Sequence, residues 1–147
     1  MIKDTATPSG ELVITLVNEN GVVKESKKIK NLIVDVGRYH IASRLVSSGL
    51  PAAMEWMSVG TDSALPAVSN TALGAETGRV SIGTINDSDN TVTFSASFGA
   101  GVGTGALAEA GIFNDSATGT LLSRTTFATV NKLSGDTMTI DWTITIS

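Results

Sequence analysis

The segment from Thr137 to Ile146 constrains the fold more than any other part of this 147-residue chain. Its even-numbered positions are Met, Ile, Trp, Ile and Ile, and its odd-numbered positions are four threonines and one aspartate. This period of two is that of an extended strand, whose successive side chains point to opposite faces. At about 3.3 Å per residue, the segment spans about 33 Å. We therefore expect a long β-strand with one face in the core and one hydroxyl-lined face on the surface.

Shorter runs of similar character recur along the chain and are separated by turn residues. These runs are rich in β-branched, aromatic and alternating apolar residues, and they cover 11–17, 22–30, 54–59, 79–85, 91–98, 107–113 and 120–128. Asn20-Gly21 predicts a tight hairpin turn between the first two runs, since it tolerates positive φ. Strands do not alternate with helices here. The sequence therefore predicts an all-β fold, an antiparallel β-sandwich of about eight strands.

A single segment predicts an α-helix, which we expect near residues 35–48. Asp35 is the predicted N-cap, and apolar residues from position 34 onward fall near helical spacing. They are Val34, Ile41, Ala42, Leu45 and Val46. Gly49, which can adopt the left-handed conformation, and Pro51 are expected to end the helix. Its predicted role is to pack against a sheet.

Two further segments set the expected domain organisation. Residues 1–10 mix Thr, Pro, Ser and Gly with little apolar content, which indicates an extended N-terminal arm or a frayed terminus. A single β-sandwich domain is expected over 11–147. The glycine-rich segment Gly99–Gly105 lacks the lysine of a phosphate-binding loop, and a strand rather than a helix follows it. It is predicted to be a flexible loop between strands.

The composition excludes several kinds of site. The chain has no cysteine and one histidine, which argues against disulfides, cysteine-based zinc sites and sites that need two histidines. Its net charge of −4 argues against nucleic acid as a partner, because phosphate binding needs clustered basic residues. No apolar run is long enough to span a bilayer, and the first residues contain no signal-peptide core. We expect a soluble protein that is made and used in a reducing cytoplasm or does not depend on redox conditions, and that uses no membrane and no cofactor.

Potential catalytic and metal-binding residues each have a simpler interpretation. His40 lies in the predicted helix and is expected to be structural or at the surface, because no nucleophile motif accompanies it. Glu109 and Asp141 could form a carboxylate pair, yet Asp141 lies on the outward side of its strand. Asn86–Asn90 resembles part of a calcium loop but lacks the central glycine and the final glutamate, so we expect a turn. No catalytic or metal-ligating residue is predicted.

The basic residues of one predicted strand form the densest charged cluster in the chain. They are Lys24, Lys27, Lys28 and Lys30, and only five basic residues follow them. One interpretation is a solvated edge strand, where lysines discourage unwanted pairing. The other is a docking site for an acidic protein surface.

Five phrases of the sequence together resemble a known group of proteins. They are Lys30–Val34, Met57–Thr61, Thr71–Glu76, Gly105–Asn114 and Asp136–Ile144. In these phrases the chain resembles small virion proteins of tailed bacteriophages, in particular the capsid cement (decoration) proteins of some short-tailed phages. The resemblance covers roughly residues 30 to 146 and carries no catalytic residue.

This resemblance implies a jelly-roll fold and a non-enzymatic role. The expected partners are the major capsid protein and further copies of the chain, as a homodimer or homotrimer, on the exterior of a capsid. The arm at 1–10 and the Lys24–Lys30 strand would face the capsid, and a sheet edge or Gly99–Gly105 would meet the neighbouring subunit. A tail, baseplate or fibre-associated protein is the alternative. A host-surface binding module with affinity for glycans is a third possibility.

Overall fold

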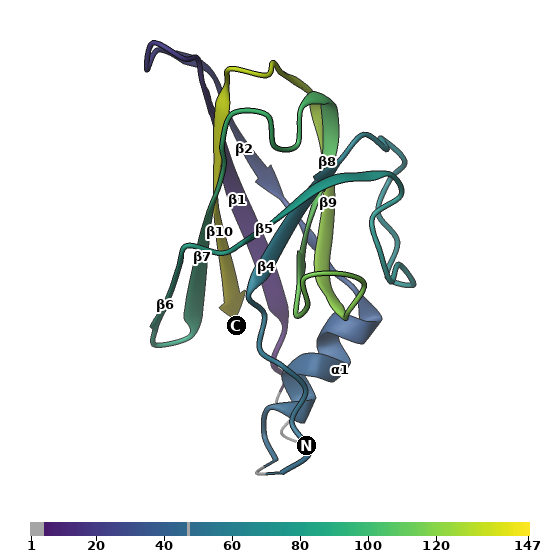
Figure 1. Ribbon diagram of the computed structural model, residues 1–147. Helices are drawn as coiled ribbons and strands as arrows, with labels where there is room; N and C mark the ends of the chain where they lie inside the picture. The colour runs from purple at the N-terminus through teal and green to yellow at the C-terminus, as the bar shows by residue number, and fades with distance from the viewer. Residues whose placement is uncertain (1–4, 47) are drawn as a thin grey trace.

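Two five-stranded antiparallel sheets face one another in the computed structural model, which describes residues 5–46 and 48–147 (Figure 1). The first sheet has the order β2-β1-β10-β7-β6, and its strands are Val23–Lys30, Pro8–Val17, Thr137–Ile146, Thr91–Phe98 and Thr84–Ser88. The second has the order β3-β9-β8-β4-β5, and its strands are Leu32–Ile33, Leu121–Lys132, Gly105–Phe113, Trp56–Gly60 and Glu76–Ser81. The predicted all-β antiparallel sandwich is confirmed.

Strand β10 lies at the centre of the first sheet, between β1 and β7. Met138, Ile140, Trp142 and Ile144 of this strand are buried. Trp142 lies opposite Leu12 on one side and Phe94 on the other. The odd-numbered residues of β10 point away from the second sheet, as the alternation predicts. The interior between the sheets therefore forms from residues of both termini and of the middle of the chain.

The predicted strand at 79–85 is two strands that belong to different sheets. Strand β5 pairs with β4 and ends at Ser81, and β6 pairs with β7 and begins at Thr84. Ile82 and Gly83 carry the chain from one sheet to the other. The predicted turn at Asn86–Asn90 is correspondingly shorter, because residues 86–88 belong to β6. Only Asp89 and Asn90 form the turn, with Asp89 at a φ of 52°.

The helix α1 is shorter than the predicted 35–48 and spans Asp35–Ser43. Its N-cap is Val34, not Asp35, and no side chain caps it. After Ser43 the backbone hydrogen bonds join residues three apart, for example Leu45 to Ala42, so the last turn tightens and stops. Leu45 and Val46, two of the apolar residues at helical spacing, lie beyond the helix and are both exposed. Gly49 does have a positive φ, but it lies beyond the helix.

The sandwich begins inside the predicted N-terminal arm. Strand β1 starts at Pro8, and its first residues pair with the end of β10. Thr7 and Ser147 exchange two backbone hydrogen bonds of 2.7 and 3.0 Å just before this pair. Residues 8–10 are therefore part of the first sheet rather than of an arm, and residues 1–4 lie outside the described residues.

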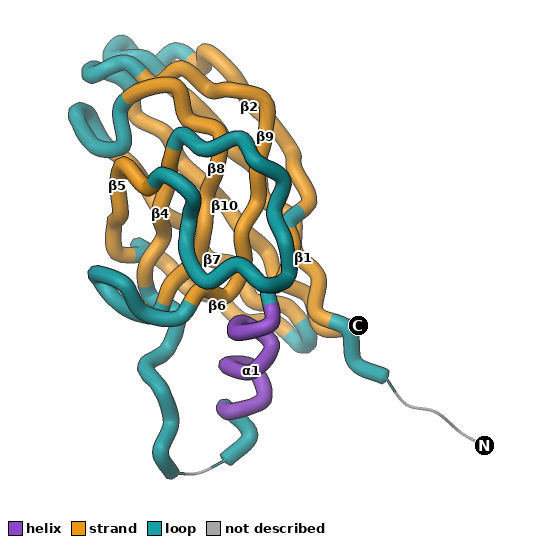
Figure 2. The backbone as a smooth tube through the Cα atoms, turned by 90° about the vertical axis from the view of Figure 1, so that its right-hand side faces the viewer, coloured by secondary structure: helices purple, strands orange, loops and turns teal. Residues whose placement is uncertain are grey.

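The loop between β4 and β5 covers the outer face of the second sheet, as Figure 2 shows. Leu73 of this loop packs with Val34, Phe113 and Leu121 in a second apolar cluster, separate from the main core. Half-buried Trp56 lies against the same cluster. The outer face of the first sheet has no such cover among the described residues, so the two faces of the molecule differ.

Candidate interaction surfaces

The lysine cluster lies on β2, which is an edge strand of the first sheet. This agrees with the interpretation of the cluster as a solvated edge strand. Lys28 and Lys30 are exposed, and Lys28 makes a 3.2 Å ion pair with Glu11 across the strand pair. Lys24 and Lys27 instead donate hydrogen bonds to other segments of the chain. The four lysines therefore do not form one continuous basic patch.

Lys24 lies at a β-bulge near the start of β2. Val17 lies opposite Val23, and Leu16 lies opposite Glu25, so Lys24 is the extra residue in β2. Its Nζ donates to Asp136 Oδ2 at 2.7 Å, in the turn that leads into β10.

Lys27 lies on the side of β2 that faces the second sheet. Its Nζ donates to the carbonyl oxygen of Ala128 in β9 at 2.7 Å and lies 3.1 Å from Glu25. Lys24 and Lys27 thus tie the edge of the first sheet to other elements, which is a structural role.

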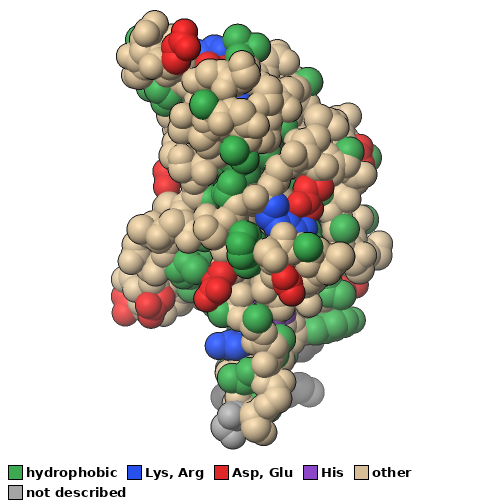
Figure 3. Space-filling model, in the orientation of Figure 1, with side chains coloured by type: hydrophobic (Ala, Val, Ile, Leu, Met, Phe, Trp, Pro, Cys, Tyr) green, Lys and Arg blue, Asp and Glu red, His purple; other side chains and the backbone are tan. Residues whose placement is uncertain are grey.

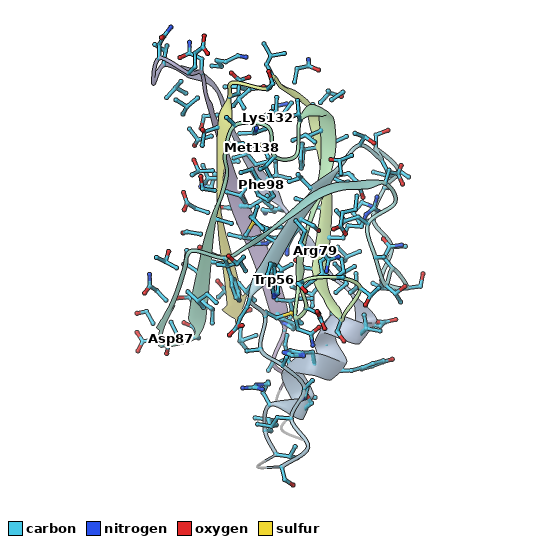
Figure 4. The ribbon with its side chains drawn as sticks, in the orientation of Figure 1. Trp56, Arg79, Asp87, Phe98, Lys132 and Met138 are labelled. Carbon is cyan, nitrogen blue, oxygen red and sulfur yellow. The ribbon has the colours of Figure 1, made fainter. Side chains whose placement is uncertain are left out.

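A buried lysine lies near the Lys24–Asp136 pair. Lys132 is 1% exposed, and its Nζ donates to the carbonyl oxygen of Gly99 at 2.8 Å. In Figure 4 it lies above Met138 and Phe98, toward the end of the sandwich opposite α1. Burial lowers the pKa of Lys132, and nearby Asp136 partly offsets this effect. Hydrogen bonds from Lys24 and from the Leu133 backbone hold the pKa of Asp136 below its usual value.

The outer face of the first sheet is rich in hydroxyl groups. Strand register aligns these side chains into rows across the sheet, one of which is Ser26, Thr15, Thr139 and Ser97. Neighbouring rows contain a 3.0 Å contact between the hydroxyls of Thr93 and Thr143 and a 2.7 Å hydrogen bond from Ser95 to Asp141. This face confirms the hydroxyl-lined surface that the alternation predicts.

The end of the sandwich at α1 presents exposed apolar side chains. Tyr39, Leu45, Val46 and Leu50 are 68, 88, 56 and 41% exposed. They lie on α1 and on the segment that follows it, which extends beyond the two sheets (Figures 1 and 2). On the side of the molecule seen in Figure 3, charged and apolar side chains are interspersed among other side chains.

The structure separates Glu109 from Asp141, so the carboxylate pair considered from the sequence does not form. Asp141 is exposed on the outer face of the first sheet, whereas Glu109 is fully buried under the loop that covers the second sheet. Glu109 accepts backbone hydrogen bonds of 2.7 to 3.0 Å from Asp62, Gly74 and Ala75. Buried Arg124 also donates to it at 3.1 Å. This network fastens the loop to the sheet.

Sequence reasoning missed the Glu109–Arg124 pair as a structural element. The residues are 15 positions apart and lie on adjacent strands β8 and β9, where Gly111 pairs with Arg124 and Glu109 with Thr126. The one available signal was a charged residue within an otherwise small and apolar segment, Leu107–Phe113. Arg124 also donates to Asn70 Oδ1 at 3.1 Å, so it contacts the loop at two points.

His40 is a buried residue of α1 with 7% of its surface exposed. Its Nδ1 has no hydrogen-bond partner among the described residues. Burial, and to a smaller extent the positive charge of Arg44, lower the pKa of His40 below 6.5, so the imidazole is neutral at pH 7.

The remaining predicted loops contain no assembled site. Within residues 5–46 and 48–147, no group of three or more His, Asp or Glu side chains is arranged to hold a metal ion. The glycine-rich segment connects β7 to β8 through residues 99–104, and its last glycine begins β8. Gly101, Gly103 and Gly105 have positive φ. No helix in the described part of the chain is long and apolar enough to cross a membrane.

Comparison of the chain with protein-family models, with curated proteins and with solved structures finds no match.

Proposed function

We propose that this chain is a non-enzymatic structural protein of a tailed-phage virion, which binds the outside of the capsid and cements neighbouring subunits of the major capsid protein. The resemblance over residues 30 to 146 suggests this role. The β-sandwich, the uncovered hydroxyl-rich face and the exposed apolar end at α1 are compatible with a protein whose task is adhesion.

The apolar end at α1 is the observation that carries the proposal. Four large apolar side chains within twelve residues are exposed there, three of them by more than half. Exposed apolar side chains grouped in this way are characteristic of sites that bind another protein. The end of β2 that carries Lys28 and Lys30 leads through β3 into α1, so a basic edge adjoins the apolar end. An acidic and partly apolar capsid surface would complement both.

Binding to an assembled shell in preference to its separated subunits would stabilise that shell by mass action. A map of the particle encoded by the same genome tests the proposal directly. Density for the chain over the junctions between capsid subunits, at a copy number on the order of hundreds, is the expected result. Tens of copies or fewer, located on the tail, would assign it to the tail or baseplate instead.

The lysines allow a sharper test, because the structure divides them into two pairs. Lys28→Gln with Lys30→Gln should lower capsid occupancy about 2- to 10-fold at low salt and much less at high salt, since exposed ion pairs are weak and screened. The matched control, Lys24→Gln with Lys27→Gln, removes the same charge from side chains that are bonded internally. Its effect should appear first in the stability of the fold. Equal occupancy of the wild type and the Lys28/Lys30 variant at both salt concentrations would reject this docking edge.

A further inference from the structure

A cavity opens between the sheets at the α1 end of the sandwich. Its volume is about 360 Å³, near the lower end of the range typical of small-molecule sites. The inner face of the first sheet forms one wall, and α1 with the segment before β4 forms the other. The apolar side chains that line these walls include Val92, Phe94, Ile144, Ile146, Ile41 and Met54.

Three polar residues, His40, Arg44 and Asn90, also line this cavity. His40 is more than nine-tenths buried, and its Nδ1 lacks a partner among the described residues. A buried polar atom without a partner costs free energy, so a ligand that supplies a hydrogen bond here would recover it.

Arg44 supplies the positive charge of the cavity. One of its guanidinium nitrogens donates to the carbonyl oxygen of Pro51 at 2.9 Å, which holds the side chain against the segment after α1. The guanidinium has further N–H donors, and no carboxylate of the described residues forms an ion pair with it. The cavity thus combines an apolar interior, one cation and one unsatisfied imidazole.

We propose that this cavity binds a small apolar anion, namely a single-chain carboxylate. The alkyl chain would lie between the sheets, and the carboxylate would lie at Arg44 and His40. A carboxylate suits this pair because a guanidinium prefers an anionic acceptor and a neutral imidazole can donate one hydrogen bond. The cavity lies at the same α1 end as the exposed apolar side chains, but the proposal does not rest on capsid binding, and its test needs only the isolated protein.

Titration calorimetry of the full chain with decanoate, below its micellar range, tests the proposal. Saturable binding is expected, and octanoate should bind about 15-fold more weakly, because each buried methylene contributes about fourfold. Decanol should bind about 10-fold more weakly than decanoate, since it lacks the charge. Equal binding of decanol would assign the cavity to uncharged apolar groups, such as a partner's side chain, and would overturn the proposal.

Two variants and one control localise the binding. Arg44→Gln should weaken decanoate binding about 10-fold and leave decanol binding unchanged. Arg38→Gln is the matched control, because Arg38 is exposed on the same helix and does not line the cavity. Val92→Phe fills the cavity and should abolish binding.

A spectroscopic measurement on the unmodified protein covers the case in which Val92→Phe unfolds. Decanoate should shift the methyl NMR signals of Val92, Ile144 and Ile146 and leave those of Leu73 and Leu121 in place. No saturable binding, or shifts that spread over both apolar clusters, would overturn the proposal.

Discussion

At the scale of single residues, several charged groups of this chain hold its loops and strands together. Glu109 is fully buried and accepts three backbone hydrogen bonds as well as one from Arg124. Arg79 shows the same use of charge near the surface. It pairs with Glu76 at 2.7 Å, donates to two carbonyl oxygens of the β8–β9 turn, and lies 3.8 Å from the centre of the Phe113 ring. These contacts hold loops on the second sheet.

Glu109→Ala should destabilise the protein by about 3–5 kcal/mol, because it leaves buried Arg124 and three backbone amides without their acceptor. Chemical unfolding followed by circular dichroism measures this change. The matched control is Glu11→Gln, which removes an exposed carboxylate paired with Lys28 and should change stability by less than about 0.5 kcal/mol. Similar effects of the two substitutions would contradict the structural role given to Glu109.

Asp136 makes the stability of the fold depend on pH in the acid range. Its hydrogen bonds in the folded state lower the pKa of the carboxyl below the ordinary 3.8. As the pH falls, this carboxyl is therefore protonated in the unfolded chain before it is protonated in the folded protein. The contribution of the Asp136 carboxylate to the free energy of unfolding is complete above pH 3.8, and it is lost as the pH falls through the folded-state pKa.

Asp136→Asn should lower the free energy of unfolding at neutral pH. The free energy of unfolding of this variant should also fall less steeply than that of the wild type as the pH is lowered. The measurement is the unfolding free energy of both proteins from about pH 6 to about pH 2.5. The difference between them should shrink as the pH falls. A difference that stays constant over this range would show that the Asp136 carboxylate does not contribute through its charge.

At the scale of elements, α1 is held by one close backbone contact rather than by a continuous apolar face. A Cβ placed on Gly37 would lie 2.0 Å from the carbonyl oxygen of Leu122 in β9. His40 is the other buried residue of the helix, while Tyr39 and the residues after Ser43 are exposed. The helix therefore depends on the absence of a side chain at position 37.

Gly37→Ala should destabilise the fold by about 1–3 kcal/mol, because the added methyl forces α1 away from β9. Alanine is otherwise more favourable than glycine in a helix by about 1 kcal/mol. The substitution would therefore stabilise the protein if position 37 did not lie against the Leu122 carbonyl oxygen. Thermal unfolding distinguishes the two outcomes by the sign of the shift in Tm. Gly99→Ala is the control, since a Cβ there meets no atom within 4 Å.

At the scale of the whole molecule, two apolar clusters lie on opposite sides of the second sheet. Trp142 is buried in the main core, and Trp56 packs against the cluster beneath the covering loop. The strands β4, β8 and β9 contribute residues to both clusters, so we expect them to unfold together.

The two tryptophans allow this expectation to be tested. In Trp142→Phe the fluorescence reports on Trp56, and in Trp56→Phe it reports on Trp142. Within each variant, fluorescence and circular dichroism should give the same denaturant midpoint, as a two-state transition requires. A fluorescence midpoint below that of circular dichroism in Trp142→Phe would show that the loop and its cluster detach before the sandwich unfolds.

Sequence patterns predicted most strands because the alternation of side chains is a local property. Residues 91–98 and 137–146 coincide with β7 and β10. The turn at Asn20-Gly21 was also predicted, and Gly21 has a φ of 80°. The candidate surface was predicted only in part, because sequence proximity groups four lysines that the β2 bulge and the neighbouring elements divide.

By itself, the sequence determined that the chain forms an antiparallel β-sandwich with one buried and one hydroxyl-rich face in its last strand. Only the tertiary structure decided that β10 lies in the centre of a sheet, that residues 79–85 divide between two sheets, and that α1 stops at Ser43. It also decided the burial of Glu109 and Lys132 and the position of His40 at a cavity. The physical reason is that period and turn chemistry act between neighbouring residues, whereas these outcomes depend on contacts between residues far apart in the chain.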